Sequence, residues 1–99
     1  MSQPRRRPTV VVMGATAEEP PPGIDEAATM ADLSFAASAP ALAEAIADAD
    51  AVFAWHSVRE LLPEVWPKAG GLRWIQSASD GVDWLLFPEL VDSDVMVTN

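Results

Sequence analysis

The turn before Gly81 has the residue types and spacing of an anion-binding site. Gly81 follows the apolar run of residues 72–76 and opens a predicted helix that continues through Phe87. The first N–H groups of a helix have no partner within it, and the helix dipole favours negative charge there. The turn can therefore hold a carboxylate. Alternatively, Gly81 only permits a tight turn between the strand and the helix.

Asp80 has two interpretations beside this turn. Its spacing to Asp83 is that of a helix N-cap and the third helical residue, and Asp is a good cap. As a cap, its side chain turns away from an anion held by the free N–H groups at the start of the helix. If it faces that anion instead, its charge repels a carboxylate ligand.

His56 is the only histidine of the chain, and it directly follows an apolar run that ends at Trp55. It either lines a cleft together with Trp55 or is an ordinary loop residue. The chain has no cysteine, so disulfides, thiolate metal sites and cysteine nucleophiles are excluded. We assign no metal ligand and no catalytic residue. Three tryptophans are expected in the core or at an interface: Trp66, Trp74 and Trp84.

The charge of the chain limits the classes of partner. It has 6 Lys and Arg against 15 Asp and Glu, and half of the basic residues are Arg5, Arg6 and Arg7. This acidic excess repels phosphate backbones and anionic headgroups, so neither nucleic acid nor a membrane surface is an expected partner. No apolar run reaches the length of a membrane span, and no secretory signal is present. We therefore expect a cytoplasmic protein.

Apolar runs and breakers predict alternating strands and helices after a disordered tail, residues 1–8. Buried strands are indicated by β-branched or aromatic runs, and helices by apolar spacing and by prolines at helix starts and ends. Pro88 is predicted to end the last helix, and residues 20–22, three prolines, form a loop. The predicted strands cover residues 9–14, 33–36, 51–55, 72–76 and 94–98, and the predicted helices cover 24–31, 40–48, 61–68 and 81–87.

This alternation is typical of βαβ units and of the α/β class, with helices on both faces of a parallel sheet. Five strands in one small domain, residues 9–99, favour the flavodoxin-like order 2-1-3-4-5, in which ligands bind at the carboxyl ends of the strands. The chain stops at Asn99 directly after a strand, so we expect an incomplete domain. The five glycines do not form the G-x-G-x-x-G turn that binds dinucleotides.

The second half of the chain resembles the substrate-binding domain of the D-isomer-specific 2-hydroxyacid dehydrogenases, closest to their glyoxylate/hydroxypyruvate reductase-like branch. The resemblance lies in three segments: AVFAWH at 51–56, LRWIQSASDGVD at 72–83 and VMVTN at 95–99. One position departs from the family pattern, because the residue at the place of Asp80 is usually small or apolar there. The first half matches only by its pattern of strands and helices.

The resemblance implies that this chain forms one side of a substrate-binding cleft. The amides of Asp80 and Gly81 would bind the carboxylate of a small 2-oxo or 2-hydroxy acid, and Trp55 and His56 would line the cleft. A separate domain would bind NAD or NADP and supply the Arg, Glu and His for hydride transfer. This chain alone would then bind no cofactor and catalyse nothing; a homodimer is compatible with this. The alternative is a stand-alone flavodoxin-like binding or interaction module.

Overall fold

The computed structural model describes residues 7–55, 61–78 and 86–98. Within them, five parallel strands form one sheet of order β2-β1-β3-β4-β5, as predicted from the sequence. The strands are β1 (Thr9–Met13), β2 (Asp32–Ala36), β3 (Ala51–Ala54), β4 (Trp74–Ser77) and β5 (Met96–Thr98). The described helices are α1 (Ile24–Ala27), α2 (Ala39–Ile46), α3 (Leu61–Val65), the 3-10 helix η1 (Trp66–Lys68) and α4 (Pro88–Val91).

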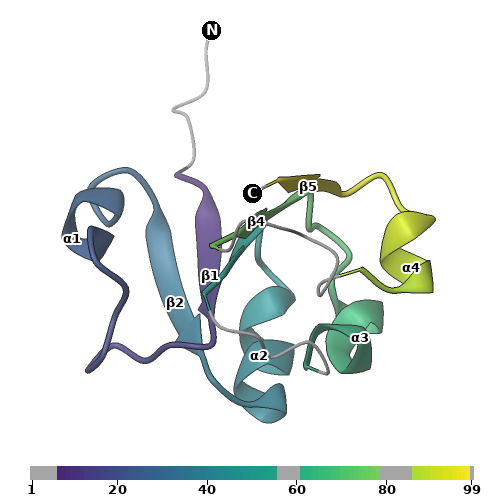
Figure 1. The fold of residues 1–99 in the computed structure, drawn as a ribbon, viewed down its shortest axis with the longest axis horizontal. Coiled ribbons are helices and arrows are strands. Elements are labelled where there is room, and N and C mark those ends of the chain that lie inside the picture. Colours follow the sequence, from purple (N-terminus) through teal and green to yellow (C-terminus); the bar gives the residue numbers. More distant parts are fainter. Residues whose placement is uncertain (1–6, 56–60, 79–85, 99) are drawn as a thin grey trace, which may run out of the picture.

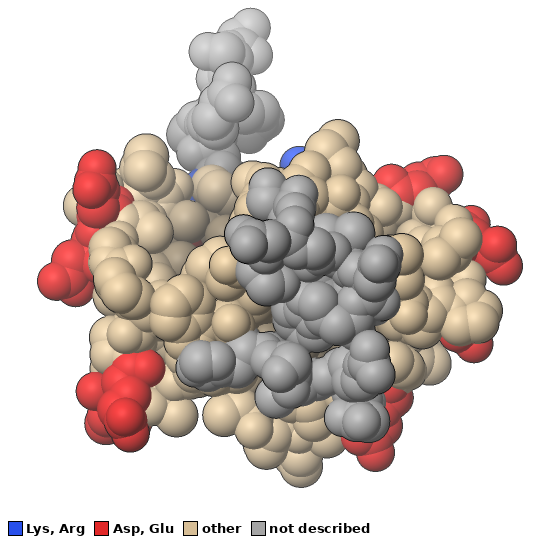
Figure 2. Space-filling view, in the orientation of Figure 1, with Lys and Arg blue, Asp and Glu red and all other residues tan. Residues whose placement is uncertain are grey.

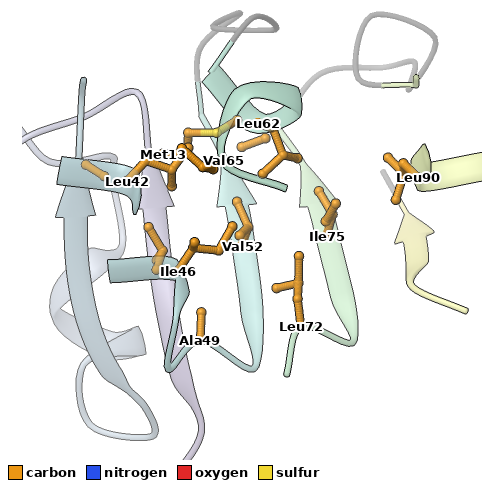
Figure 3. Packing of buried hydrophobic residues seen from close by; sticks show 13 residues of the cluster. Met13, Leu42, Ile46, Ala49, Val52, Leu62, Val65, Leu72, Ile75 and Leu90 are labelled. Atoms are coloured by element: carbon orange, nitrogen blue, oxygen red, sulfur yellow. The ribbon is translucent and has the colours of Figure 1, made fainter. Parts of the chain in front are cut away.

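The hydrophobic core lies on one face of this sheet, under α2, α3 and α4. Alternate residues along a strand point to the same face, so Val11, Val52 and Ile75 form a continuous apolar row across β1, β3 and β4. Leu42 and Ile46 of α2 pack onto this row with no exposed surface, and Leu62, Val65 and Leu90 complete the cluster (Figure 3). Both α2 and α3 are short, and their apolar faces are stabilised mainly by this packing.

The opposite face of the sheet carries α1 over β1 and β2 (Figure 1). Ile24 and Ala27 of α1 face Val10, Val12 and Leu33 across an apolar hollow of about 250 Å³. Arg7 holds the end of this helix, because its Nη2 donates to the carbonyl oxygens of Ala28 at 2.6 Å and Ala31 at 2.8 Å. The described helices therefore cover both faces, but the second face only above β1 and β2.

Several helix boundaries differ from the predictions: α2 ends at Ile46 rather than Asp48, and the predicted helix 61–68 is divided into α3 and η1. Pro88 was predicted to end a helix, but it occupies the first turn of α4, where its missing N–H would have no helical partner in any case. Leu86 and Phe87, expected at the end of that helix, lie in no regular element, while residues 81–85 fall outside the described part of the chain. The helix α1 ends at Ala27 rather than Ala31, and the chain turns directly into β2.

Candidate functional site

The strand order switches direction between β1 and β3, and the carboxyl ends of these two strands lie at the same edge of the sheet. From β1 the chain continues to β2, which lies on one side of the β1–β3 pair. From β3 it continues to β4, which lies on the opposite side of that pair. The loops that follow these two adjacent strands therefore diverge, and ligands of open α/β sheets bind where this divergence occurs. We take this carboxyl edge as the candidate site.

The loop after β1 forms one wall of the site. Gly14 has a φ of 91°, a left-handed conformation that favours glycine, and its N–H donates to the carbonyl oxygen of Ala36 at 2.8 Å. Ala15 is buried, and the loop then runs over the surface with Glu18 and Glu19 exposed. Beyond Ala15 this loop therefore presents two carboxylates, which would repel an anion.

Trp55 follows β3 and forms the second wall. Its backbone N–H donates to the carbonyl oxygen of Met13 at 3.0 Å, which extends the ladder between β1 and β3 by one residue. Its half-buried ring lies 6.0 Å from the ring of Phe53, with an angle of 36° between the planes. The structure thus places Trp55, one residue of the predicted site, directly after β3 and beside the end of β1.

The end of β4 lies beside the end of β3. The N–H of Ala78 donates to the carbonyl oxygen of Ala54 at 3.0 Å, so the two chain exits are adjacent. Three predicted site residues, His56, Asp80 and Gly81, follow these exits in sequence but fall outside the described residues. Their roles stay predictions.

Ser77 is a buried polar residue at this edge that the sequence pattern did not single out. It was expected to begin the loop after the fourth strand, but it is the last residue of β4, with 2% of its surface exposed. Its inward direction follows from its register, because Ser77 lies opposite Ala54 on the core face of the sheet. A register assignment from the alternation of residues 74–77 could have indicated this.

The described residues at this edge do not fit a dinucleotide cofactor. After Gly14 the chain enters a loop with two glutamates and three prolines, whereas a dinucleotide turn passes directly into a helix whose N-terminus faces the phosphates. Across residues 7–55, 61–78 and 86–98, no three acidic or histidine side chains gather as metal ligands. None of the helices described for these residues is long and apolar enough to cross a bilayer.

Neither a scan against protein-family models nor searches of curated proteins and of solved structures gave a match to this chain.

Proposed function

We propose that this chain is the substrate-binding part of a D-2-hydroxyacid dehydrogenase, an enzyme that interconverts 2-oxo acids and D-2-hydroxy acids with NAD or NADP. The observation that carries the proposal is the divergence of the loops after β1 and β3, with Trp55 at that point. This divergence supports a ligand site at the carboxyl edge of the sheet. In the sequence, His56 comes shortly after β3, and Asp80 and Gly81 come shortly after β4.

The part assigned to this chain is to bind and orient the substrate. The amides of Asp80 and Gly81 would hold the substrate carboxylate, and the Trp55 ring would limit the space beside it. Of the described residues directly after the carboxyl ends of β1, β3 and β4, residues 14–19, 55 and 78, none is a histidine or lysine that could deliver a proton to a bound 2-oxo acid. Proton and hydride transfer would belong to a separate cofactor-binding domain.

An NMR titration of the isolated chain with oxalate and glyoxylate tests the site. We expect amide shifts at Trp55, His56, Asp80 and Gly81, and none at Gly23, a turn glycine that precedes α1. Chloride at equal ionic strength controls for general anion effects. Shifts of equal size at Gly23, or no shifts in the four predicted residues, would overturn the proposal.

The same titration on Asp80→Ala separates the two interpretations of this residue. If Asp80 caps a helix, the variant loses about 0.5 to 2 kcal/mol of stability, and its oxalate affinity stays nearly unchanged. If the carboxylate faces the ligand, stability changes little and oxalate binds more tightly, because a like charge is gone. We expect the first result. Asp25→Ala, which removes an exposed acid of α1, serves as the matched control.

A stand-alone interaction module is the second candidate, and the exposure of Trp74 (44%) and Met96 (62%) on one sheet face favours it. Such a module needs no cofactor domain. The coding sequence distinguishes the two functions: an in-frame G-x-G-x-x-G segment downstream of the Asn99 codon supports the enzyme, and a stop codon at that point supports the module.

A further inference from the structure

The helix α1 has few stabilising contacts of its own. It comprises four residues, none of them buried, and a helix this short is unstable in water unless tertiary contacts support it. Gly23 precedes it and supplies no side-chain cap, and no basic residue lies in its last turn. The carbonyl groups at the end of this helix and in the turn after it therefore need a donor from another part of the chain.

Arg7 donates to these carbonyl groups from a position just before β1. Its Nη2 bonds to the carbonyl oxygens of Ala28, 21 residues away in sequence, and of Ala31, 24 residues away, and its Nε lies 3.5 Å from Asp32 Oδ1. A cation at the carboxyl end of a helix also interacts favourably with the helix dipole. Asp25 lines the same hollow as Arg7 and Asp32, and acidic side chains lie on the side of the molecule that carries α1 (Figure 2). Arg7 thus ties α1 to the start of β1.

Two neighbouring valines of β1 lie on opposite sides of the sheet, and only one of them lies beneath α1. Val12 points to the second face and lines the hollow under Ile24 and Ala27, with 1% of its surface exposed. Val11 points to the core face, where it belongs to the core cluster and has no exposed surface. Among the described residues, none from α1 contributes to that cluster. The packing of the core therefore does not depend on α1.

We propose that α1 is a lid over this hollow and that Arg7 is the latch that holds it closed. When the bonds of Arg7 break, α1 moves away and uncovers Val12 while the core cluster stays packed, as in local opening of the weakly held parts of a fold. Gly14 and Gly23, both with positive φ, bound the connection from β1 to α1, and residues of this kind absorb the backbone changes of a hinge. The same connection forms the first wall of the candidate site, so the latch also limits how far that wall moves.

Thiol labelling of the whole chain tests the lid, because the chain has no cysteine of its own. Val12→Cys places a thiol beneath α1, Val11→Cys places one in the core, and Met30→Cys, at a residue that is 66% exposed, gives the rate of an exposed thiol. The reagent is methyl methanethiosulfonate, which is small and uncharged. We expect Val12→Cys to react more slowly than Met30→Cys but faster than Val11→Cys. Its rate should also depend less on urea than that of Val11→Cys, because local opening exposes less surface than unfolding does.

Arg7→Gln tests the latch in the Val12→Cys background. Loss of the hydrogen bonds from a charged donor should raise the labelling rate about tenfold or more. Arg73→Gln makes the same change of charge at an exposed arginine before β4 and should leave the rate within about twofold. Amide hydrogen exchange, measured without any introduced thiol, is the second readout. The N–H groups of Ala28 and Ala31 bond to carbonyl groups of α1, and their protection should fall in Arg7→Gln.

Circular dichroism melts show whether each variant folds. Equal rates and equal urea dependence for Val12→Cys and Val11→Cys would mean that α1 opens only when the whole chain unfolds, and would overturn the lid. A Val12→Cys thiol that reacts as fast as the Met30→Cys thiol would also overturn it, because the hollow would not be closed. The latch would be overturned if Arg7→Gln had no more effect than Arg73→Gln on labelling and on amide protection.

Discussion

Thr9 and Asp50 hold the amino ends of β1 and β3 together through two reciprocal hydrogen bonds. The Thr9 N–H donates to Asp50 Oδ2 at 2.8 Å, and the Asp50 N–H donates to the carbonyl oxygen of Thr9 at 2.8 Å. The Asp50 carbonyl oxygen also accepts from the Arg73 N–H at 3.0 Å, so this residue links the starts of β1, β3 and β4. Asp50 therefore fixes the register of three adjacent strands at one edge.

We expect Asp50→Ala to lower the free energy of unfolding by about 1 to 3 kcal/mol, because the Thr9 N–H loses its charged acceptor. Asp50→Asn keeps an oxygen at the same place and should cost clearly less. Urea unfolding followed by circular dichroism measures both variants. Equal losses for the two variants would contradict a role that rests on the acceptor atom.

Replacing Ile75 tests the assignment of the core face. Ile75 has no exposed surface and belongs to the core cluster. Ile75→Ala should cost about 2 to 5 kcal/mol, and Ile75→Val about 0.5 to 1.5 kcal/mol, as deletions in packed cores do. Val91→Ala removes a side chain that is 63% exposed and should change stability little. Similar values for Ile75→Ala and Val91→Ala in chemical denaturation would show that the core lies elsewhere.

Comparing Gly23→Ala with Gly70→Ala isolates the effect of backbone conformation on stability. A Cβ at either position meets no atom within 4 Å, but only Gly23, with a φ of 82°, has the left-handed conformation. Gly23→Ala should therefore destabilise by about 1 to 2 kcal/mol, whereas Gly70→Ala should be neutral or slightly stabilising. Thermal melts of both variants check this. A destabilised Gly70→Ala beside an unchanged Gly23→Ala would refute the argument.

We expect the isolated chain to bind neither NADH nor NADPH. The loop after β1 places Glu18, Glu19 and three prolines where a phosphate would need helix amides and positive charge. Isothermal titration calorimetry with each cofactor measures this directly, with AMP as a control for adenine binding alone. A complex of micromolar affinity would show that the argument from this loop is wrong.

The order of the sheet was predictable because each strand is a short β-branched or aromatic run between clear breakers. Most residues of the runs TVVVM and AVFA are buried, and the connections between successive strands are long enough for crossovers. The prediction is confirmed down to the strand order. Parallel pairing could be predicted from the sequence because every connection between successive strands is long enough to return to the opposite end of the sheet. A tight hairpin would have given antiparallel pairing.

The helix boundaries were less predictable, since proline has two roles. Pro40 and Pro88 both occupy first turns, but only Pro40 follows a side chain that accepts a capping bond: Ser38 accepts from the Ala41 N–H at 3.4 Å. Phe87 provides no such cap and gives no helix-start signal in the sequence. What fixes α4 is the burial of Leu90 against the core, a tertiary contact that no local pattern records.

The candidate site was predictable only in part. The position of Trp55 at the end of β3 follows from its place after an apolar run, and the structure agrees. The predictions for His56, Asp80 and Gly81 rest on the sequence resemblance, and their residues lie outside the described part of the chain. The exposure of Trp74 (44%) was not predictable from its residue type, because a tryptophan in a strand is expected in the core or at an interface.

The separation of β1 and β3 along the chain has a consequence for synthesis on the ribosome. β1 pairs with β2 on one side and β3 on the other, and Thr9 and Asp50 are 41 residues apart in sequence. The apolar strand TVVVM therefore leaves the ribosomal exit tunnel well before its second partner does. During this interval one of its edges is unpaired, which is the state in which β-rich segments associate wrongly. Chaperone demand for this protein should be concentrated between the emergence of β1 and that of β3.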